Sequence, residues 1–183
     1  TDAFTQLSDA ILYAYNNSDV TSIWVARGTY KPVSPGGSRT ATFQLMNNLA
    51  LYGGFAGNED PATFNLANRD IAANPTILSG DLNGDDGPNF TNNAENAYHV
   101  VTVASPIETA VLDGFTIQGG NANSTTSPND RGGGLYYDNG KLIMANCSFT
   151  GNTSYFAGGA MYGNGNHHVN LNRCRFTSNT STK

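Results

Sequence analysis

The sequence has few charged residues, and its lysines and arginines form no cluster. Only 13% of the 183 residues are Asp, Glu, Lys or Arg, and the formal net charge is −5. Nucleic acids and anionic membranes are bound through concentrated basic charge. The composition therefore argues against both as partners of this chain.

Long hydrophobic runs are also missing. No apolar stretch approaches the ~20 residues of a membrane-spanning helix, and residues 1–25 lack the basic start and apolar core of a signal peptide. The sequence opens on a helical pattern and stops directly after a repeat. We therefore expect no membrane span in this segment, and we expect the chain to be a fragment of a longer protein.

The abundant residues indicate short strands and turns. Glycine occurs 21 times, and hydrophobic residues make up 38% of the chain, which is too apolar for a disordered protein. Asn, Thr, Ser and Gly separate short apolar runs, as in proteins whose strands are joined by polar turns. One helix is predicted at the N-terminus, where Phe4, Leu7, Ile11 and Tyr15 recur at helical spacing and Asp2 is the expected N-cap.

An internal repeat points to the architecture. Two segments align, GGGLYYDNGKLIMANCSFTGNTS (132–154) and AGGAMYGNGNHHVNLNRCRFTSNTS (157–181), offset by 25 residues in the glycine part and by 27 in the later part. The two extra residues fall at 166–168, where we expect a turn. A unit of this length with about three short strands cannot bury a core alone, so its copies must stack.

We therefore predict an all-β fold, a right-handed parallel β-helix of about six or seven coils. Residues 1–20 would form an amphipathic helix that caps one end of this solenoid, and residues 21–183 its coils, in a single domain. A cap shields an open sheet edge, which otherwise pairs with other chains. The end at Lys183 shows no cap pattern, so we expect further coils or a partner there.

Several motifs carry a family resemblance. IWVARGTYKP, LALYGGFAGNE, TILSGDLNGDD, VLDGFTIQGGNA and CSFTGNTS follow one another along the chain. Together they resemble the polymorphic-outer-membrane-protein-like family of right-handed parallel β-helix repeat proteins, found in large bacterial surface and secreted proteins. The resemblance runs from about Phe4 to the end. It implies an extracellular or cell-surface location and, most often, adhesion, and its motifs carry no catalytic signature.

Asparagine and phenylalanine recur at the 27-residue interval. Asn152 and Asn179 are expected to bridge neighbouring coils through their amides, although each also begins a formal N-glycosylation sequon. Phe149 and Phe176 are expected to stack in the core, in a column that continues to Ile117. A second, aliphatic column would pair Leu142 with Val169 and Met144 with Leu171.

The only two cysteines, Cys147 and Cys174, also lie one repeat apart. Stacking would place their Cα atoms about 5 Å apart, within the range for a disulfide, and an extracellular setting would permit one. Side chains stacked in register point the same way, however, and buried thiols pack well as small apolar groups. The sequence leaves a disulfide and a pair of free thiols both open.

One acidic loop has the spacing of a calcium site. In GDLNGDDGPN, Asp81, Asn83 and Asp85 stand at alternate positions, as the first ligands of an EF-hand loop do. The loop departs from that pattern, since Asp86 replaces the glycine and position twelve is Asn92 rather than glutamate. One interpretation is a weak Ca²⁺ site formed by Asp81, Asn83, Asp85 and Asp86. The other is a solvated turn.

An enzymatic function is an alternative, because some parallel β-helices are pectate lyases or polygalacturonases. Such enzymes need paired carboxylates on adjacent coils, or a carboxylate cluster with a base. Here the acids at 81–86 share one loop, and no base is placed opposite them. The remaining candidates have ordinary structural interpretations: Asp113 in a turn, Arg131 at the end of the insertion 122–131, His99 in a strand, and His167 and His168 in a turn.

A carbohydrate-binding module is the third alternative. Tyr137 and Tyr162, if they face outward, would stack with the neighbouring Tyr136 into an aromatic strip able to pack on sugar rings. Packing in the core is the other interpretation of these tyrosines. The function predicted first is a non-catalytic structural or adhesive module of a bacterial surface or secreted protein. Its expected partners are another copy of itself, further coils at the C-terminal end, or surface glycans and proteins, and it requires no cofactor.

Overall fold

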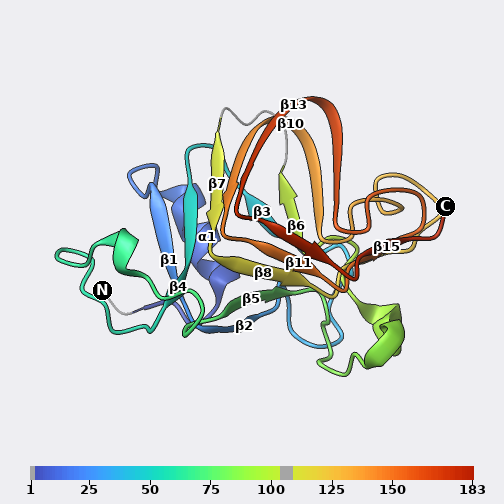
Figure 1. Cartoon of the computed structure of the whole chain (residues 1–183), viewed down its shortest axis with the longest axis horizontal. Coiled ribbons are helices and arrows are strands. Elements are labelled where there is room, and N and C mark those ends of the chain that lie inside the picture. The colour runs from blue at the N-terminus through green and yellow to red at the C-terminus, as the bar shows by residue number, and fades with distance from the viewer. Residues whose placement is uncertain (1–2, 104–108) are drawn as a thin grey trace.

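The computed structural model describes residues 3–103 and 109–183, and its strands pair in three parallel sheets (Figure 1). The first sheet has the order β1-β4-β7-β10-β6-β3, and β13 also pairs with β10. Its strands are β1 (Ser22–Ala26), β3 (Phe43–Leu45), β4 (Ala50–Phe55), β6 (Val101–Val103), β7 (Ala110–Asp113), β10 (Leu135–Ala145) and β13 (Met161–Asn172).

The second sheet has the order β14-β11-β8-β5-β2, and the third β15-β12-β9. The strands of the second sheet are β2 (Gly28–Tyr30), β5 (Thr76–Ser79), β8 (Phe115–Gln118), β11 (Ser148–Thr150) and β14 (Arg175–Thr177). Those of the third are β9 (Asn121–Ala122), β12 (Thr153–Ser154) and β15 (Thr180–Ser181).

Helix α1 (Leu7–Asn16) packs against β1 and β3. Its buried stripe is formed by Leu7, Ala10, Ile11 and Ala14. The prediction that Phe4 and Tyr15 belong to the apolar face is wrong, since they are 51% and 71% exposed. The N-cap is Gln6, whose side chain makes no capping bond, and the predicted cap Asp2 lies outside the described residues.

The prediction of an all-β, right-handed parallel β-helix is wrong. The fold is mixed, with 11% helix and 39% strand, and its parallel sheets have an α/β-like arrangement in which one sheet forms a half-barrel. The interval between paired strands is also irregular along the chain. Here Ser148 pairs with Arg175, but Ala50 pairs with Val111 and Phe43 with Val101, at more than twice that interval.

Long connections in the first half of the chain cause this irregularity. The loops 56–75 and 80–100 contain the 3-10 helices η1 (Leu66–Asn68), η2 (Pro88–Phe90) and η3 (Asn93–Glu95). The second of these loops extends away from the sheets at the lower right of Figure 1. Strand β10 then joins two columns of strands, because its first part pairs with β6 and its last part with β7.

The repeat predicted from the sequence does produce regular pairing after residue 132. Strands β10, β11 and β12 pair in parallel with β13, β14 and β15, and we call each of these sets of three strands a layer. The set β13, β14 and β15 is the terminal layer. The offset is 26 residues at Leu135 and Met161 and becomes 27 at Gly140 and His167, after an irregularity opposite Asp138. The expected turn at 166–168 is instead part of β13.

Glycines allow the layers to approach at one corner. A Cβ atom on any of three glycines would collide with a carbonyl oxygen of the neighbouring backbone segment. Gly120 would meet the oxygen of Gly133, Gly133 that of Thr153, and Gly159 that of Thr180. Only glycine fits such positions. The paired glycines of the repeat are thus a packing requirement of the backbone.

Candidate functional site

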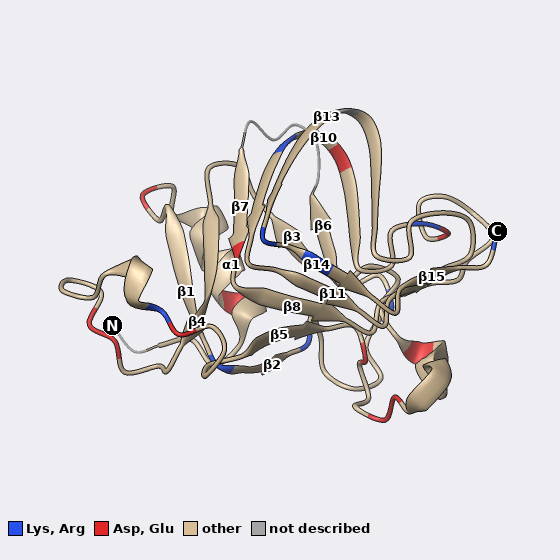
Figure 2. Cartoon of the chain, in the orientation of Figure 1, with Lys and Arg blue, Asp and Glu red and all other residues tan. Residues whose placement is uncertain are grey.

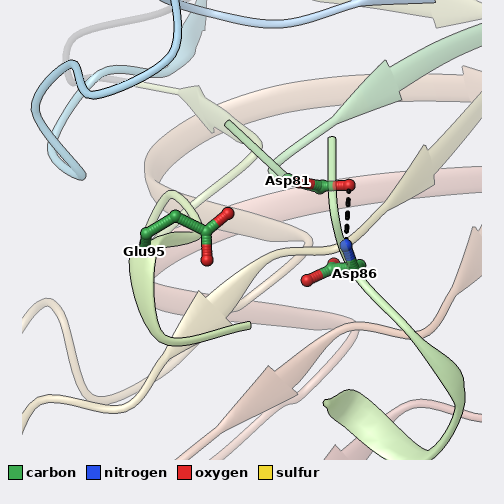
Figure 3. Close-up of side chains that lie close together, drawn as sticks. All are labelled: Asp81, Asp86 and Glu95. Carbon is green, nitrogen blue, oxygen red and sulfur yellow. Dashed lines mark hydrogen bonds between the residues drawn. The ribbon is translucent and has the colours of Figure 1, made fainter. Parts of the chain in front are cut away.

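The acidic loop between β5 and β6 is the one place among the described residues where three carboxylates converge (Figure 3). One oxygen each from Asp81, Asp86 and Glu95 lies within 4.8 Å of the others. Asp81 and Glu95 are half-buried and Asp86 is exposed. The loop 80–100 folds back through η3, and this reversal brings Glu95 to the two aspartates.

Asp81 closes the loop by accepting from the backbone. Its Oδ1 accepts from the N–H groups of Gly84 at 2.5 Å and Asp85 at 3.2 Å, and its Oδ2 accepts from Asp86 N–H at 3.3 Å. An Asx-type turn of this kind holds the loop together through its own backbone. The Asp81 carboxylate therefore has a structural role whether or not a ligand is bound.

The pKa of Asp86 is raised by its position in the cluster. Although the residue is exposed, partial burial of its carboxyl raises the pKa, and the negative charges of Asp81, Glu95 and Asp85 raise it further. The Asn96 amide, which donates to Asp86 Oδ2 at 2.7 Å, acts in the opposite direction. Asn96 also donates to Gly119 O at 2.7 Å and is only 1% exposed, so it anchors the loop to the body.

The predicted calcium ligands are only partly brought together. Asp81 and Asp86 belong to the cluster of acidic side chains and Asp85 does not, and Glu95 takes part although its spacing matched no motif. Carboxylate oxygens are the ligands that Ca²⁺ prefers. These three residues are accordingly the ones that could hold a cation, and the Ca²⁺ site stays a prediction.

Asn152 and Asn179 lie in consecutive layers and bond to each other. Asn152 Nδ2 donates to Asn179 Oδ1 at 2.9 Å and to Ile117 O at 3.0 Å. The same geometry repeats one layer on, where Asn179 Nδ2 donates to Phe149 O at 2.8 Å. With a fully buried side chain, Asn152 satisfies backbone groups that a turn would otherwise leave unpaired.

The aromatic and aliphatic columns reach the surface at the terminal layer. Phe149 and Phe176 stack with ring centroids 5.1 Å apart, and Phe149 pairs with Ile117 on its other side. Phe149 is buried, but Phe176 is 44% exposed. In the aliphatic column, Leu171 is likewise 45% exposed, although its register partner Met144 is buried.

The cysteines are free thiols. Cys147 is buried and its Sγ donates to Ala145 O at 3.2 Å, while Cys174 is half-buried. The neighbouring Cys147 thiol lowers the pKa of Cys174 below its usual range, and contact with Cys174 together with burial raises the pKa of Cys147. The two sites are equivalent in the repeat but differ chemically, since the terminal layer covers Cys147 and no described strand covers Cys174.

The register of the tyrosine strip differs by one residue from the predicted pairing of Tyr137 with Tyr162. Register pairs Tyr136 with Tyr162, whose rings stack with centroids 6.2 Å apart, and it pairs Tyr137 with Gly163. Tyr137 is fully buried, and its hydroxyl donates to Gly140 O. The Tyr162 ring also faces the Arg131 guanidinium, 5.0 Å from its centroid. Tyr137 therefore cannot contribute to a sugar platform.

The candidate catalytic residues have structural partners. Asp113 forms a salt bridge of 2.7 Å with Arg69, and both side chains are largely buried. Burial lowers the pKa of His99, whose Nδ1 lies 2.9 Å from Gly132 O. Arg131 pairs with Asp130 at 2.7 Å. None of these residues faces the acidic loop within hydrogen-bonding distance.

Sequence reasoning missed the role of the arginines in holding the long loops. Arg69 joins loop 56–75 to the sheet, because it also donates to Gly53 O at 2.9 Å. Arg39 donates to Asn96 O at 2.6 Å and to Asn121 O at 2.8 Å. The one feature of the sequence that could have pointed to this role is that Arg39 and Arg69 stand apart from other basic residues, of which the chain has only nine in all.

The terminal layer has an open edge. Among the described residues, each of its strands pairs with one neighbour only, β13 with β10, β14 with β11 and β15 with β12. At the other end of the first sheet, α1 packs beside β1 and β3. The two ends of the molecule are therefore unlike, one covered by a helix and one presenting backbone and apolar side chains.

Comparison with protein-family models, with curated proteins and with solved structures finds no match to this chain. Among the described residues, no helix has the length and apolar character needed to cross a membrane.

Proposed function

We propose that the chain is a non-catalytic structural and adhesive module of a bacterial surface or secreted protein, and that it associates with a second copy of itself through its terminal layer. The observation that carries this proposal is the exposure of Phe176 and Leu171 beside three strands that, in the described part of the chain, pair on one side only. Unpaired strand edges accept further protein, and apolar side chains gain stability when another surface covers them.

The alternatives have weaker support. Glycosidases hold two carboxylates on either side of a bound sugar, but the three converging carboxylates sit together on one loop. Four concavities of the described structure are lined by other residues, and Asp81, Asp86 and Glu95 line none of these four. The carbohydrate-binding alternative is weakened because Tyr137 is buried in the core and cannot contact a sugar.

Sedimentation velocity over a range of protein concentrations tests the proposal. The unmodified chain is expected to form species larger than the monomer, and Phe176→Lys is expected to shift them toward the monomer. Phe156→Lys is the matched control, because Phe156 is 48% exposed outside the terminal layer. Leu171→Lys provides a second variant of the same layer, and thermal unfolding verifies that each variant is folded.

A chain that stays monomeric at every concentration would rule out self-association. Equal loss of association in Phe176→Lys and Phe156→Lys would show that the terminal layer is not the surface involved.

A further inference from the structure

The two ends of the molecule carry charges of opposite sign. Residues 161–183, which comprise the terminal layer and the residues that follow it, contain Arg173, Arg175 and Lys183 but no aspartate or glutamate. All three side chains are exposed, and Figure 2 shows basic residues beside β14 and at the C-terminus. Over the whole chain the net charge is −5, so this basic end contrasts with the rest of the molecule.

The α1 end is acidic. Asp9 and Asp19 are exposed, and Glu59 lines a concavity with Gln6 and Ala10. The basic residues on this side are Lys31, which lines another concavity with Asp9, and Arg27, which follows β1. Asp9 lies in the first turn of α1. The order of strands in the first sheet puts β1, next to α1, and the terminal strand β13 on opposite sides of β10.

The acidic end also has a shape that can receive an apolar surface. A groove of about 880 Å³ runs between α1 and β3, and Ile11, Met46 and Leu49 contribute to its lining. Leu12 and Tyr15 border it and are 60% and 71% exposed. The terminal layer presents the matching apolar groups, Leu171 and Phe176.

Charge decides between two ways of joining copies. Contact between two terminal layers would bring Arg173 and Arg175 against the same residues of the partner copy, and such like-charge contacts are unfavourable. Contact between a terminal layer and an α1 end brings these arginines to Asp9 and Asp19. A contact between two different surfaces repeats from copy to copy and generates an open chain rather than a closed dimer.

We propose that the basic terminal layer of one copy docks on the acidic α1 end of a second copy, with Phe176 and Leu171 covering the groove between α1 and β3. This inference rests on the self-association proposed above and identifies its second surface. Complementary charge steers the approach and makes association depend on salt, while the apolar groups provide the area that is buried.

Charge reversal at each end tests the docking. One variant carries Asp9→Lys and Asp19→Lys, and the other carries Arg173→Glu and Arg175→Glu. Each alone places like charges across the contact and is expected to associate about tenfold or more weakly than the unmodified chain. In an equimolar mixture each reversed end meets a complementary end of the other variant, so association is expected to return.

The control variant carries Asp85→Lys, a charge reversal at an exposed residue outside both ends, and should associate like the unmodified chain. If the unmodified chain associates but the mixture does not, or if each variant associates unchanged, the docking is wrong and self-association uses another surface. If the unmodified chain is monomeric, both proposals fail.

Discussion

Asn152 and Asn179 occupy equivalent positions in consecutive layers, and the amide of Asn152 donates to Oδ1 of Asn179 at 2.9 Å. Asn152 also connects to the layer before it, since its Oδ1 accepts from Gly120 N–H at 3.0 Å and its Nδ2 donates to Ile117 O at 3.0 Å. One fully buried side chain thus joins three segments of the molecule.

Asn152→Ala is expected to lower the free energy of unfolding by about 2–4 kcal/mol, because it leaves the Gly120 N–H and the Ile117 carbonyl unpaired in the interior. Asn179→Ala should cost about 1 kcal/mol, since Asn179 is half-exposed and water replaces its lost bonds. Urea unfolding of both variants measures the difference. Equal losses would contradict the bridging role of Asn152.

The backbone at Ser178 provides a second test of the repeat. Ser178, directly after β14, has φ +54°, and the equivalent positions are Gly151 after β11 at +63° and Gly119 after β8 at +70°. Glycine adopts this left-handed conformation without the steric cost that other residues meet. Ser178→Gly should therefore raise the free energy of unfolding by about 0.5–1 kcal/mol.

The reciprocal change, Gly151→Ser, isolates the backbone term. A Cβ atom at Gly151 would have no heavy atom within 4 Å, so only the conformational cost remains, and we expect a loss of about 1 kcal/mol. Chemical denaturation of both variants measures these effects. If both changes move stability in the same direction, the equivalence of the two positions is wrong.

The sequence predicted local features better than the global fold. The repeat correctly indicated which strands follow Leu135, because neighbouring copies there differ by a single irregularity. It could not indicate that Ala50 pairs with Val111. Long loops lie between these residues, and their pairing depends on side-chain packing rather than on a repeated sequence motif. The error at Tyr137 arose because a shift of one residue in register exchanges the two faces of a strand.

The carboxylate site illustrates a similar limit. Spacing in the sequence identified Asp81 and Asp86, which lie within one turn, but it also included Asp85, which is not a member of the cluster. Glu95 enters only because η3 reverses the chain and Asn96 anchors it to Gly119. No local motif encodes that reversal.

The two thiols should differ in reactivity. Because Cys174 has a lowered pKa and is half-exposed while Cys147 is buried, iodoacetamide at neutral pH should modify Cys174 first. Cys147→Ala removes the neighbouring thiol and should move the midpoint of the pH–rate profile of Cys174 upward, and Cys147→Ser, which keeps a donor, should largely restore it. Mass spectrometry identifies the modified residue. Modification of both cysteines at one rate would contradict this assignment.

The acidic loop should respond to pH through Asp86. Its pKa is raised by burial and by the neighbouring carboxylates, so the folded state binds the proton more tightly than the unfolded chain does. The ionised form is therefore destabilising above the folded pKa, and the penalty is relieved as pH falls through that pKa.

Asp86→Asn keeps an acceptor for the Asn96 amide and removes the charge. Because Asp86 is exposed and solvent screens its neighbours, we expect a gain of only about 0.5 kcal/mol at pH 7. This gain should disappear below about pH 4, where the carboxyl is protonated in both states. Thermal unfolding of the variant and the unmodified chain across this pH range measures it. Asp19→Asn is the control, since Asp19 is an exposed aspartate outside the acidic loop. A gain that persists at low pH would show that charge is not its cause.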